Sequence, residues 1–244
     1  MYKGKYIFAG KLVEVTSLHE KVHHYCAGYE GEGVPDFSVV TTQEDIDFEM
    51  QREIKCARRE NREPLNTPDD YREELAVYRK IAEKMPDYGT FLFHGSCVAV
   101  DGQGYLFTAK SGTGKSTHTR LWREYLGDKA VMVNDDKPLL SVLESGVIVH
   151  GTPYNGKHKL GSNISVPLKA ICILERAEEN HIERITKAQA YAMLLQQVYR
   201  PQDSAQMAKT LQLIDKAAER TELYRLGCNM DISAAETAYN AMKG

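Results

Sequence analysis

The chain has 244 residues, of which 31 are lysine or arginine and 34 are aspartate or glutamate, so its formal net charge at pH 7 is -3. This near balance excludes a strongly basic protein built to clamp nucleic acid. Hydrophobic residues make up 42% of the chain and charged residues 27%, which excludes a disordered or collagen-like protein. The length predicts one large domain, or one domain with a small appendage.

The sequence contains no apolar run near the roughly 18 residues that a membrane-spanning helix needs. Its first residues also lack the continuous apolar stretch of a secretory signal, so we expect a cytoplasmic protein with neither membrane nor nucleic-acid partners. The five cysteines are odd in number, widely spaced and without a C-x-x-C pair. This pattern favours reduced thiols over disulfides or a zinc site.

Residues 1–88 are predicted to form an α+β segment that either packs onto the core or docks a partner. Near-alternating apolar residues predict one or two short strands over Lys5–Ser17. A capping-box pattern at Thr41-Thr42-Gln43-Glu44 predicts an exposed helix that ends near Glu60. Thr67 before Pro68 predicts the start of a second helix, whose buried face would hold Tyr71, Leu75, Tyr78, Ala82 and Met85.

Residues 89–244 are predicted to form an α/β domain. Apolar runs at Ser96–Val100 and Tyr105–Ala109, joined by Asp-Gly-Gln-Gly, predict a hairpin. A helix is predicted over 116–126 and a strand over 130–133. Further along we expect a hairpin of residues 139–143 and 147–150, a loop at 151–163, a strand at 170–174, helices at about 187–199 and 203–220, and a last helix opened by a capping box at Ser233.

The most specific motif is the stretch 109–116, Ala-Lys-Ser-Gly-Thr-Gly-Lys-Ser, which matches the P-loop pattern G-x-x-x-x-G-K-[ST] with alanine in first place. Small residues let the backbone curl so that its N–H groups point at phosphate oxygens, and the following helix adds its positive end. The alternative is a glycine-rich turn that contains Lys-Ser by coincidence. The motif predicts a nucleotide site formed by Ser111, Gly112, Thr113, Gly114, Lys115, Ser116 and Thr117.

Asp135 and Asp136 follow the apolar strand at 130–133. A carboxylate at the end of a strand beside a P-loop can hold magnesium or receive a proton. Neighbouring residues of an extended chain point to opposite sides, so we expect the two acids to have different roles. The alternative is a solvated acidic turn before Pro138.

Four segments resemble, in order and spacing, the kinase domain of HPr kinase/phosphorylase: His94-Gly95, Asp-Gly-Gln-Gly at 101–104, the loop at 111–116, and Val-Asn-Asp-Asp at 133–136. The loop is equally similar to that of ATP-dependent phosphoenolpyruvate carboxykinase. The likeness is specific over about residues 91–140. Over residues 151–176 there is only a looser likeness, to small HPr-kinase-like proteins. It implies an α/β fold in which a mixed β-sheet with a P-loop of this type is flanked by helices.

The resemblance also implies a Mg-ATP-dependent transfer of the γ-phosphoryl group to a hydroxyl of a protein, a peptide or a small alcohol. Lys115 would bind phosphate and Ser116 magnesium. One of Asp135 and Asp136 would be the general base and the other a metal ligand, and their assignment stays open. His94 matches a histidine near the reaction centre, although a histidine after Phe-Leu-Phe also fits a satisfied core residue. Because the parent family is often oligomeric, a homo-oligomer is compatible with the sequence.

One family segment, of the type Glu-Ile-Arg-Gly-Leu-Gly after the paired acids, does not occur in this chain. In its place is a loop with Lys157, His158 and Lys159. Lys157 is a candidate catalytic residue, because cationic side chains stabilise the charge of a transferring phosphoryl group; the alternative is a solvated basic loop. The missing segment argues against HPr as the acceptor and against the reverse, phosphorolytic reaction.

Two other functions remain open from the sequence. The chain can be a nucleotide-sensing or scaffold protein that binds ATP without consuming it, with residues 1–88 as a docking module. A carboxykinase-like lyase is the third alternative, although the chain looks too short to include the additional substrate domain that this activity requires.

Overall fold

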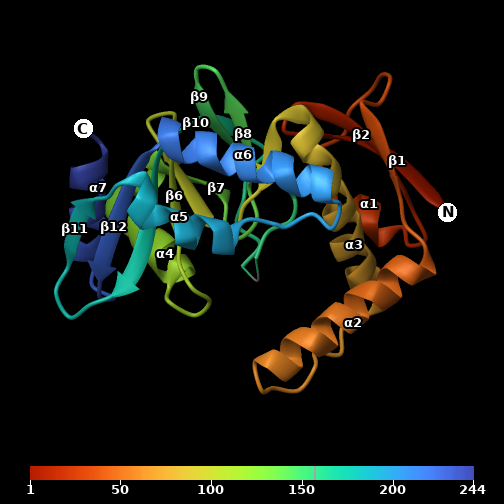
Figure 1. Ribbon diagram of the computed structural model, residues 1–244, viewed down its shortest axis with the longest axis horizontal. Helices are drawn as coiled ribbons and strands as arrows, with labels where there is room; N and C mark the ends of the chain where they lie inside the picture. Colours follow the sequence, from red (N-terminus) through yellow and green to blue (C-terminus); the bar gives the residue numbers. More distant parts are fainter. Residues whose placement is uncertain (157) are drawn as a thin grey trace. The chain divides into compact units, whose positions relative to one another are not determined.

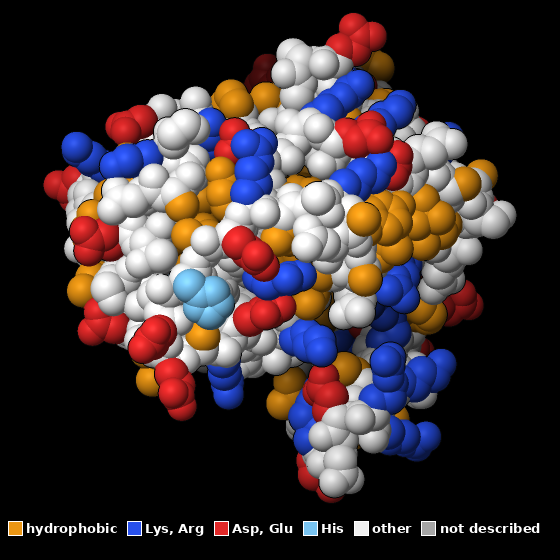
Figure 2. Space-filling view, turned by 60° about the vertical axis from the view of Figure 1, so that its left-hand side comes forward, with side chains coloured by type: hydrophobic (Ala, Val, Ile, Leu, Met, Phe, Trp, Pro, Cys, Tyr) orange, Lys and Arg blue, Asp and Glu red, His pale blue; other side chains and the backbone are white. Residues whose placement is uncertain are grey.

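The computed structural model describes residues 1–156 and 158–244. The chain forms two compact units, Met1–Lys84 and Met85–Gly244 (Figure 1). Each unit has its own sheet and helices. Within the described residues, no helix combines the length and the apolar character that crossing a bilayer would require. Figure 2 shows acidic and basic side chains interspersed over the face that it presents.

The first unit contains a three-stranded sheet in the order β1-β2-β3. The pattern over Lys5–Ser17 becomes a hairpin of β1 (Tyr2–Phe8) and β2 (Lys11–Ser17), whose two turn residues both have positive φ, as a type I′ turn requires. β3 (Phe37–Val40) pairs parallel to β2. The unit's helices are α1 (Lys21–Tyr25), α2 (Gln43–Arg59) and α3 (Asp69–Lys84). The sequence pattern predicted neither α1 nor β3.

The capping box of α2 lies one residue later than predicted. Thr42 is the N-cap, and Asp45 is the reciprocal partner at the third helical position. Thr41 is instead buried, and its hydroxyl donates to a carboxylate oxygen of Glu73. The chain thus uses Thr41 for a tertiary contact and its neighbour for the helix end.

The buried face of α3 differs in part from the prediction. Tyr78 and Ala82 are buried as expected, but Tyr71 is 40% exposed. Glu73 is fully buried near the start of the helix, because its carboxylate accepts the backbone N–H groups of Leu18 and His19 as well as the Thr41 hydroxyl. Such a set of donors offsets the cost of removing the charge from water.

The second unit contains a mixed sheet, which confirms the predicted α/β class. Its strand order is β4-β8-β9-β10-β6-β5-β7, with β12 beside β10 and β11 beside β12. The long strand β10 runs parallel to β6 and β12 but antiparallel to β9. The strands span Thr90–Leu92 (β4), Ser96–Val100 (β5), Gln103–Thr108 (β6), Ala130–Asn134 (β7), Leu139–Leu143 (β8), Gly146–His150 (β9), Ser165–Arg176 (β10), His181–Arg184 (β11) and Glu222–Cys228 (β12).

Local sequence signals located several of these strands. The predicted hairpins are β5–β6 and β8–β9, and the β5–β6 turn has positive φ at Asp101 and Gly102. The strand predicted at 170–174 is the centre of the longer β10. Strands β11 and β12 were not predicted, since polar side chains interrupt both.

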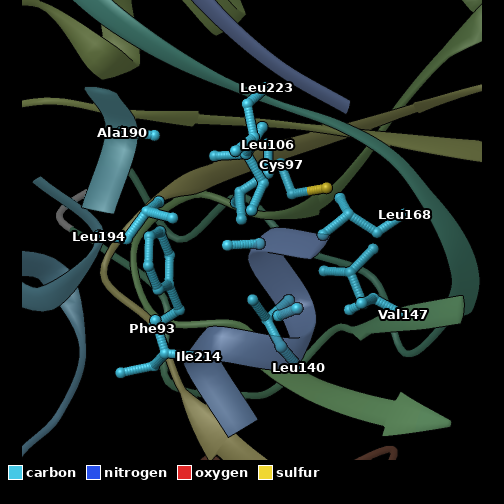
Figure 3. Close-up of a cluster of buried hydrophobic side chains, with 14 of the residues drawn as sticks. Phe93, Cys97, Leu106, Leu140, Val147, Leu168, Ala190, Leu194, Ile214 and Leu223 are labelled. Carbon is cyan, nitrogen blue, oxygen red and sulfur yellow. The ribbon is translucent and has the colours of Figure 1, made fainter. Parts of the chain in front are cut away.

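Helices cover both faces of this sheet. α5 (Lys187–Gln197) and α6 (Ser204–Arg220) pack on one face around Phe93, Leu106 and Leu194 (Figure 3). α4 (Lys115–Leu126) and α7 (Ser233–Met242) pack on the other face. Two short 3₁₀ helices, η1 (Met85–Tyr88) and η2 (Gly127–Lys129), complete the elements. The predicted capping box at Ser233 is absent, because the N-cap is Ile232 and the Ser233 N–H donates to the Asp231 carboxylate.

The core beneath α4 depends on aromatic packing. Phe107 is fully buried and makes edge contacts with Trp122 and His118, at centroid distances of 5.0 and 4.6 Å.

We expect Phe107→Ala to lower the free energy of unfolding by about 3–5 kcal/mol, because it leaves a cavity that the sheet cannot close. Urea unfolding followed by circular dichroism measures this loss. Val131→Ala, at a position that is 43% exposed, is the control and should cost under about 0.5 kcal/mol. Equal losses would contradict the packing described.

Candidate functional site

Strand direction brings several loops of the second unit to one edge of the sheet. β5 is antiparallel to both β6 and β7, so the start of β5 lies beside the ends of β6 and β7. β10 and β12 are parallel to β6 and end at the same edge. The segments that follow β6 and β7 therefore meet the segment that precedes β5. Ligands of α/β sheets commonly bind at such an edge.

A glycine-rich loop connects β6 to α4. Gly112 and Gly114 have φ values of 75° and 122°, a region that favours glycine, and Gly114 is the N-cap of α4. Lys115 is the first helical residue, and its Nζ donates to the carbonyl of Ala109 over 3.3 Å. Ala109 is fully buried and does not have a positive φ, so its methyl group meets no backbone strain there.

A cavity of about 520 Å³ lies against this loop. It brings together eight of the predicted site residues, which come from three separate segments of the chain. The residues that line it are His94, Gly112, Gly114, Lys115, Ser116, Thr117, Arg120, Asp135, Asp136, Gly156 and His158.

The two acids occupy different surroundings in this cavity. Asp135 is 6% exposed, and its carboxylate accepts the backbone N–H groups of Gly156 at 2.6 Å and Leu160 at 3.4 Å. Burial raises its pKa in spite of these bonds. Burial also opposes ionisation of Asp136, but His94 at 3.2 Å and Lys137 at 3.1 Å outweigh it and hold the pKa of Asp136 at about 2.

The expectation that these acids point to opposite sides is wrong. β7 ends at Asn134, and the chain bends at both aspartates instead of continuing extended. The Asn134 side-chain oxygen accepts the backbone N–H groups of Asp136 at 2.9 Å and Lys137 at 2.6 Å, which stabilises the bend. Both carboxylates consequently line one cavity, and their different neighbours distinguish them.

His94 lies at the cavity wall and is not a core residue. Its Nδ1 donates to Gln197 Oε1 at 2.9 Å, and its Nε2 faces Asp136. The two contacts orient the imidazole ring. Burial lowers the pKa of the Lys115 ammonium, and the negative charge of Asp136 opposes that shift.

The other predicted site residues do not all lie at the first cavity. Gly112, Gly114 and Thr117 also line a second cavity, with Thr113, while Ser111 is exposed. Lys157 lies outside the described residues. Its neighbour His158 is exposed and lines the first cavity.

Sequence reasoning missed three contributors to this region. Arg120 lines the cavity one helical turn after Ser116, so helical periodicity was a usable signal for it. Arg176 donates to the carbonyl of Gly112 at 2.7 Å, and Gln197 contacts His94 from 103 residues away. Neither of these two pairings has a local signal, because the partners are far apart in the chain and tertiary packing brings them together.

Among the described residues, no cluster of three or more His, Cys, Asp or Glu side chains has the arrangement of a metal site. Ser116, Asp135 and Asp136 nevertheless supply oxygen donors at one cavity. Mg²⁺ prefers oxygen ligands and usually takes several of them from water and substrate phosphates. These donors therefore fit Mg²⁺ that binds together with a phosphate ligand.

A family model described as "SynChlorMet cassette protein ScmC" matches residues 73–234, about two thirds of the chain. The chain belongs to the ScmC family. All the described residues that line either cavity lie within the matched stretch of this ScmC-family chain. No curated protein matches the chain. Among solved structures, the Hpr(Ser) kinase/phosphatase from Coxiella burnetii is similar, with 11% identity, a TM-score of 0.32, and coverage of 63% of this chain and 99% of that chain.

Ionised Asp136 should stabilise the fold of this ScmC-family chain. Its pKa of about 2 lies below the ordinary 3.8, so its contribution is present above the unfolded pKa and is lost as pH falls through the folded value. We expect Asp136→Asn to lower the free energy of unfolding by about 2 kcal/mol at neutral pH. That deficit should shrink between about pH 4 and pH 2.

Chemical unfolding of both proteins at a series of pH values measures this effect. Asp128→Asn, at an exposed position of η2, is the matched control and should change stability little. A deficit of Asp136→Asn that does not vary with pH would contradict the electrostatic account.

Proposed function

We propose that this protein is a Mg-ATP-dependent phosphotransferase that moves the γ-phosphoryl group to a hydroxyl of a protein, a peptide or a small alcohol. The observation that supports it best is the convergence of Lys115, Asp135 and Asp136 on one cavity beside the glycine-rich loop. Phosphoryl transfer needs a cation for the phosphates and a carboxylate for the hydroxyl proton or the metal. Both are present within this cavity.

In this proposal the loop at 109–116 is a P-loop. The positive end of α4 and the backbone N–H groups of the loop favour the phosphate oxygens. The Lys115 ammonium binds the β- and γ-phosphates, and Arg120 adds a second positive side chain at the cavity wall. Mg²⁺ would be held by Ser116 and Asp136, and when bound it neutralises charge on the phosphates.

The different environments of the acids suggest their roles. Asp135 is the proposed general base, because burial raises its pKa and so strengthens its hold on a proton. Asp136 stays ionised to low pH, as a metal ligand must, and His94 orients its carboxylate. In the transfer, the acceptor oxygen forms a bond to the γ-phosphorus while the bond from that phosphorus to the β,γ-bridging oxygen breaks. The hydroxyl proton passes to Asp135, and ADP leaves with the electron pair.

Lys115 tests nucleotide binding. ATP with Mg²⁺ should raise the melting temperature of the parent protein, since a ligand at 100 times its Kd stabilises the fold by about 2.7 kcal/mol. Lys115→Ala should lose most of this increase, because the variant lacks the ammonium group proposed to bind the β- and γ-phosphates. Differential scanning fluorimetry measures the shift. Lys129→Ala, at an exposed position beyond α4, is the control and should respond as the parent does. A Lys115→Ala protein with the parent's full response would refute the proposed phosphate site.

Asparagine substitutions separate the two acids. With γ-labelled ATP and an extract of the native host, Asp135→Asn should reduce label transfer by about 10²- to 10⁴-fold while ATP affinity changes little, because only the proton acceptor is lost. Asp136→Asn should lower both transfer and the Mg²⁺ dependence of ATP binding. Label transfer by both asparagine variants at the rate of the parent would refute the enzyme proposal. ATP binding without any labelled product would favour a nucleotide-sensing protein instead.

A further inference from the structure

A second cavity, of about 510 Å³, also borders the glycine-rich loop. Part of its lining comes from the loop and the start of α4, namely Gly112, Thr113, Gly114, Thr117 and His118. The rest comes from the ends of two parallel strands. Leu174, Arg176 and Ala177 come from the end of β10, and Cys228, Asn229 and Met230 come from the end of β12. The proposed chemistry uses none of these six residues.

We propose that this second cavity holds the nucleoside, base and ribose, of the triphosphate whose phosphates occupy the first cavity. The inference rests on the proposed function. Its geometric basis is that Gly112, Gly114 and Thr117 line both cavities. A ligand bound along the loop can therefore place its phosphates in the first cavity and its remaining part in the second.

The chemistry of the second cavity suits a flat, largely apolar ring. Leu174 and Ala177 provide apolar wall, and Met230 adds a flexible thioether. Met230 is 80% exposed, so it has no part in the core of the protein. Ligand pockets typically combine such apolar walls with a few polar groups.

His118 supplies a polar group that the fold leaves unsatisfied. The ring is 2% exposed, and its Nε2 accepts the Trp122 indole N–H at 3.0 Å. Burial lowers the pKa of His118 to about 3, so the ring is neutral and its Nδ1 carries the hydrogen. Nδ1 has no hydrogen-bonding partner among the described residues. An unpaired buried donor is costly, and an acceptor atom of a bound nucleoside can satisfy it.

Arg176 links the cavity to the loop. One guanidinium nitrogen donates to the Gly112 carbonyl, and the side chain also lines the second cavity. A planar guanidinium can stack on an aromatic ring while it keeps this bond. The side chain of Asn229 is engaged differently, since its amide nitrogen donates to Glu178 and its oxygen accepts from Asp231. Asn229 therefore shapes the rim of the cavity.

Calorimetric titration with ATP and with inorganic triphosphate, each with Mg²⁺, tests the inference. The quantity of interest is the ratio of the two affinities. Ala177→Trp fills the second cavity, so we expect it to lower ATP affinity at least about 10-fold, or 1.4 kcal/mol, and to leave triphosphate affinity unchanged. Retained triphosphate binding also shows that the variant is folded. The matched control is Ala188→Trp, at an exposed position of α5, which should keep the parent ratio.

Met230→Ala is a second variant that leaves the core untouched. It should lower ATP affinity about 3-fold with no effect on triphosphate, because it removes apolar contact with the ring alone. An affinity ratio that neither variant changes would overturn the nucleoside site and leave the phosphotransferase proposal standing. A parent protein that binds neither ligand would overturn both.

Discussion

The arrangement of this site depends on strand direction. β5 runs against β6 and β7, so its first residues meet the last residues of both neighbours. This one constraint places His94, the glycine-rich loop and the paired aspartates at one edge of the sheet. The parallel strands β10 and β12 end at the same edge and provide the second cavity. A reversal of any of these strands would carry its loop to the opposite edge.

The two carboxylates in the first cavity are stabilised by different neighbours. Two adjacent carboxylates in a partly buried place repel each other, and each also loses hydration. Asp135 is stabilised by backbone N–H groups, whereas Asp136 has His94 and Lys137. The pKa of Asp135 is raised above the ordinary value for aspartate, and the pKa of Asp136 is lowered below it. Such a separation is a common basis for dividing acid, base and metal roles within one site.

The glycine-rich loop is held from both sides. Lys115 donates to Ala109 at the start of the loop, and Arg176 donates to Gly112 in its middle. The two bonds tie the loop to its own helix and to the end of β10. Gly112 and Gly114 line both cavities, so ligands in the two cavities would contact the same loop residues.

The sequence alone determined the features that depend on neighbours along the chain. Turn residues predicted the β5–β6 and β8–β9 hairpins, and the spacing of glycine, lysine and serine predicted the loop and the start of α4. Only the tertiary structure decided the bend that turns both Asp135 and Asp136 to one cavity, the contact between His94 and Gln197, and the position of β12 beside β10. These features join residues far apart in the chain, or depend on hydrogen bonds such as those of Asn134. Local periodicity does not reveal the His94–Gln197 and β10–β12 partners, because tertiary packing brings them together. It also does not specify the side-chain conformation on which the short-range Asn134 hydrogen bonds depend.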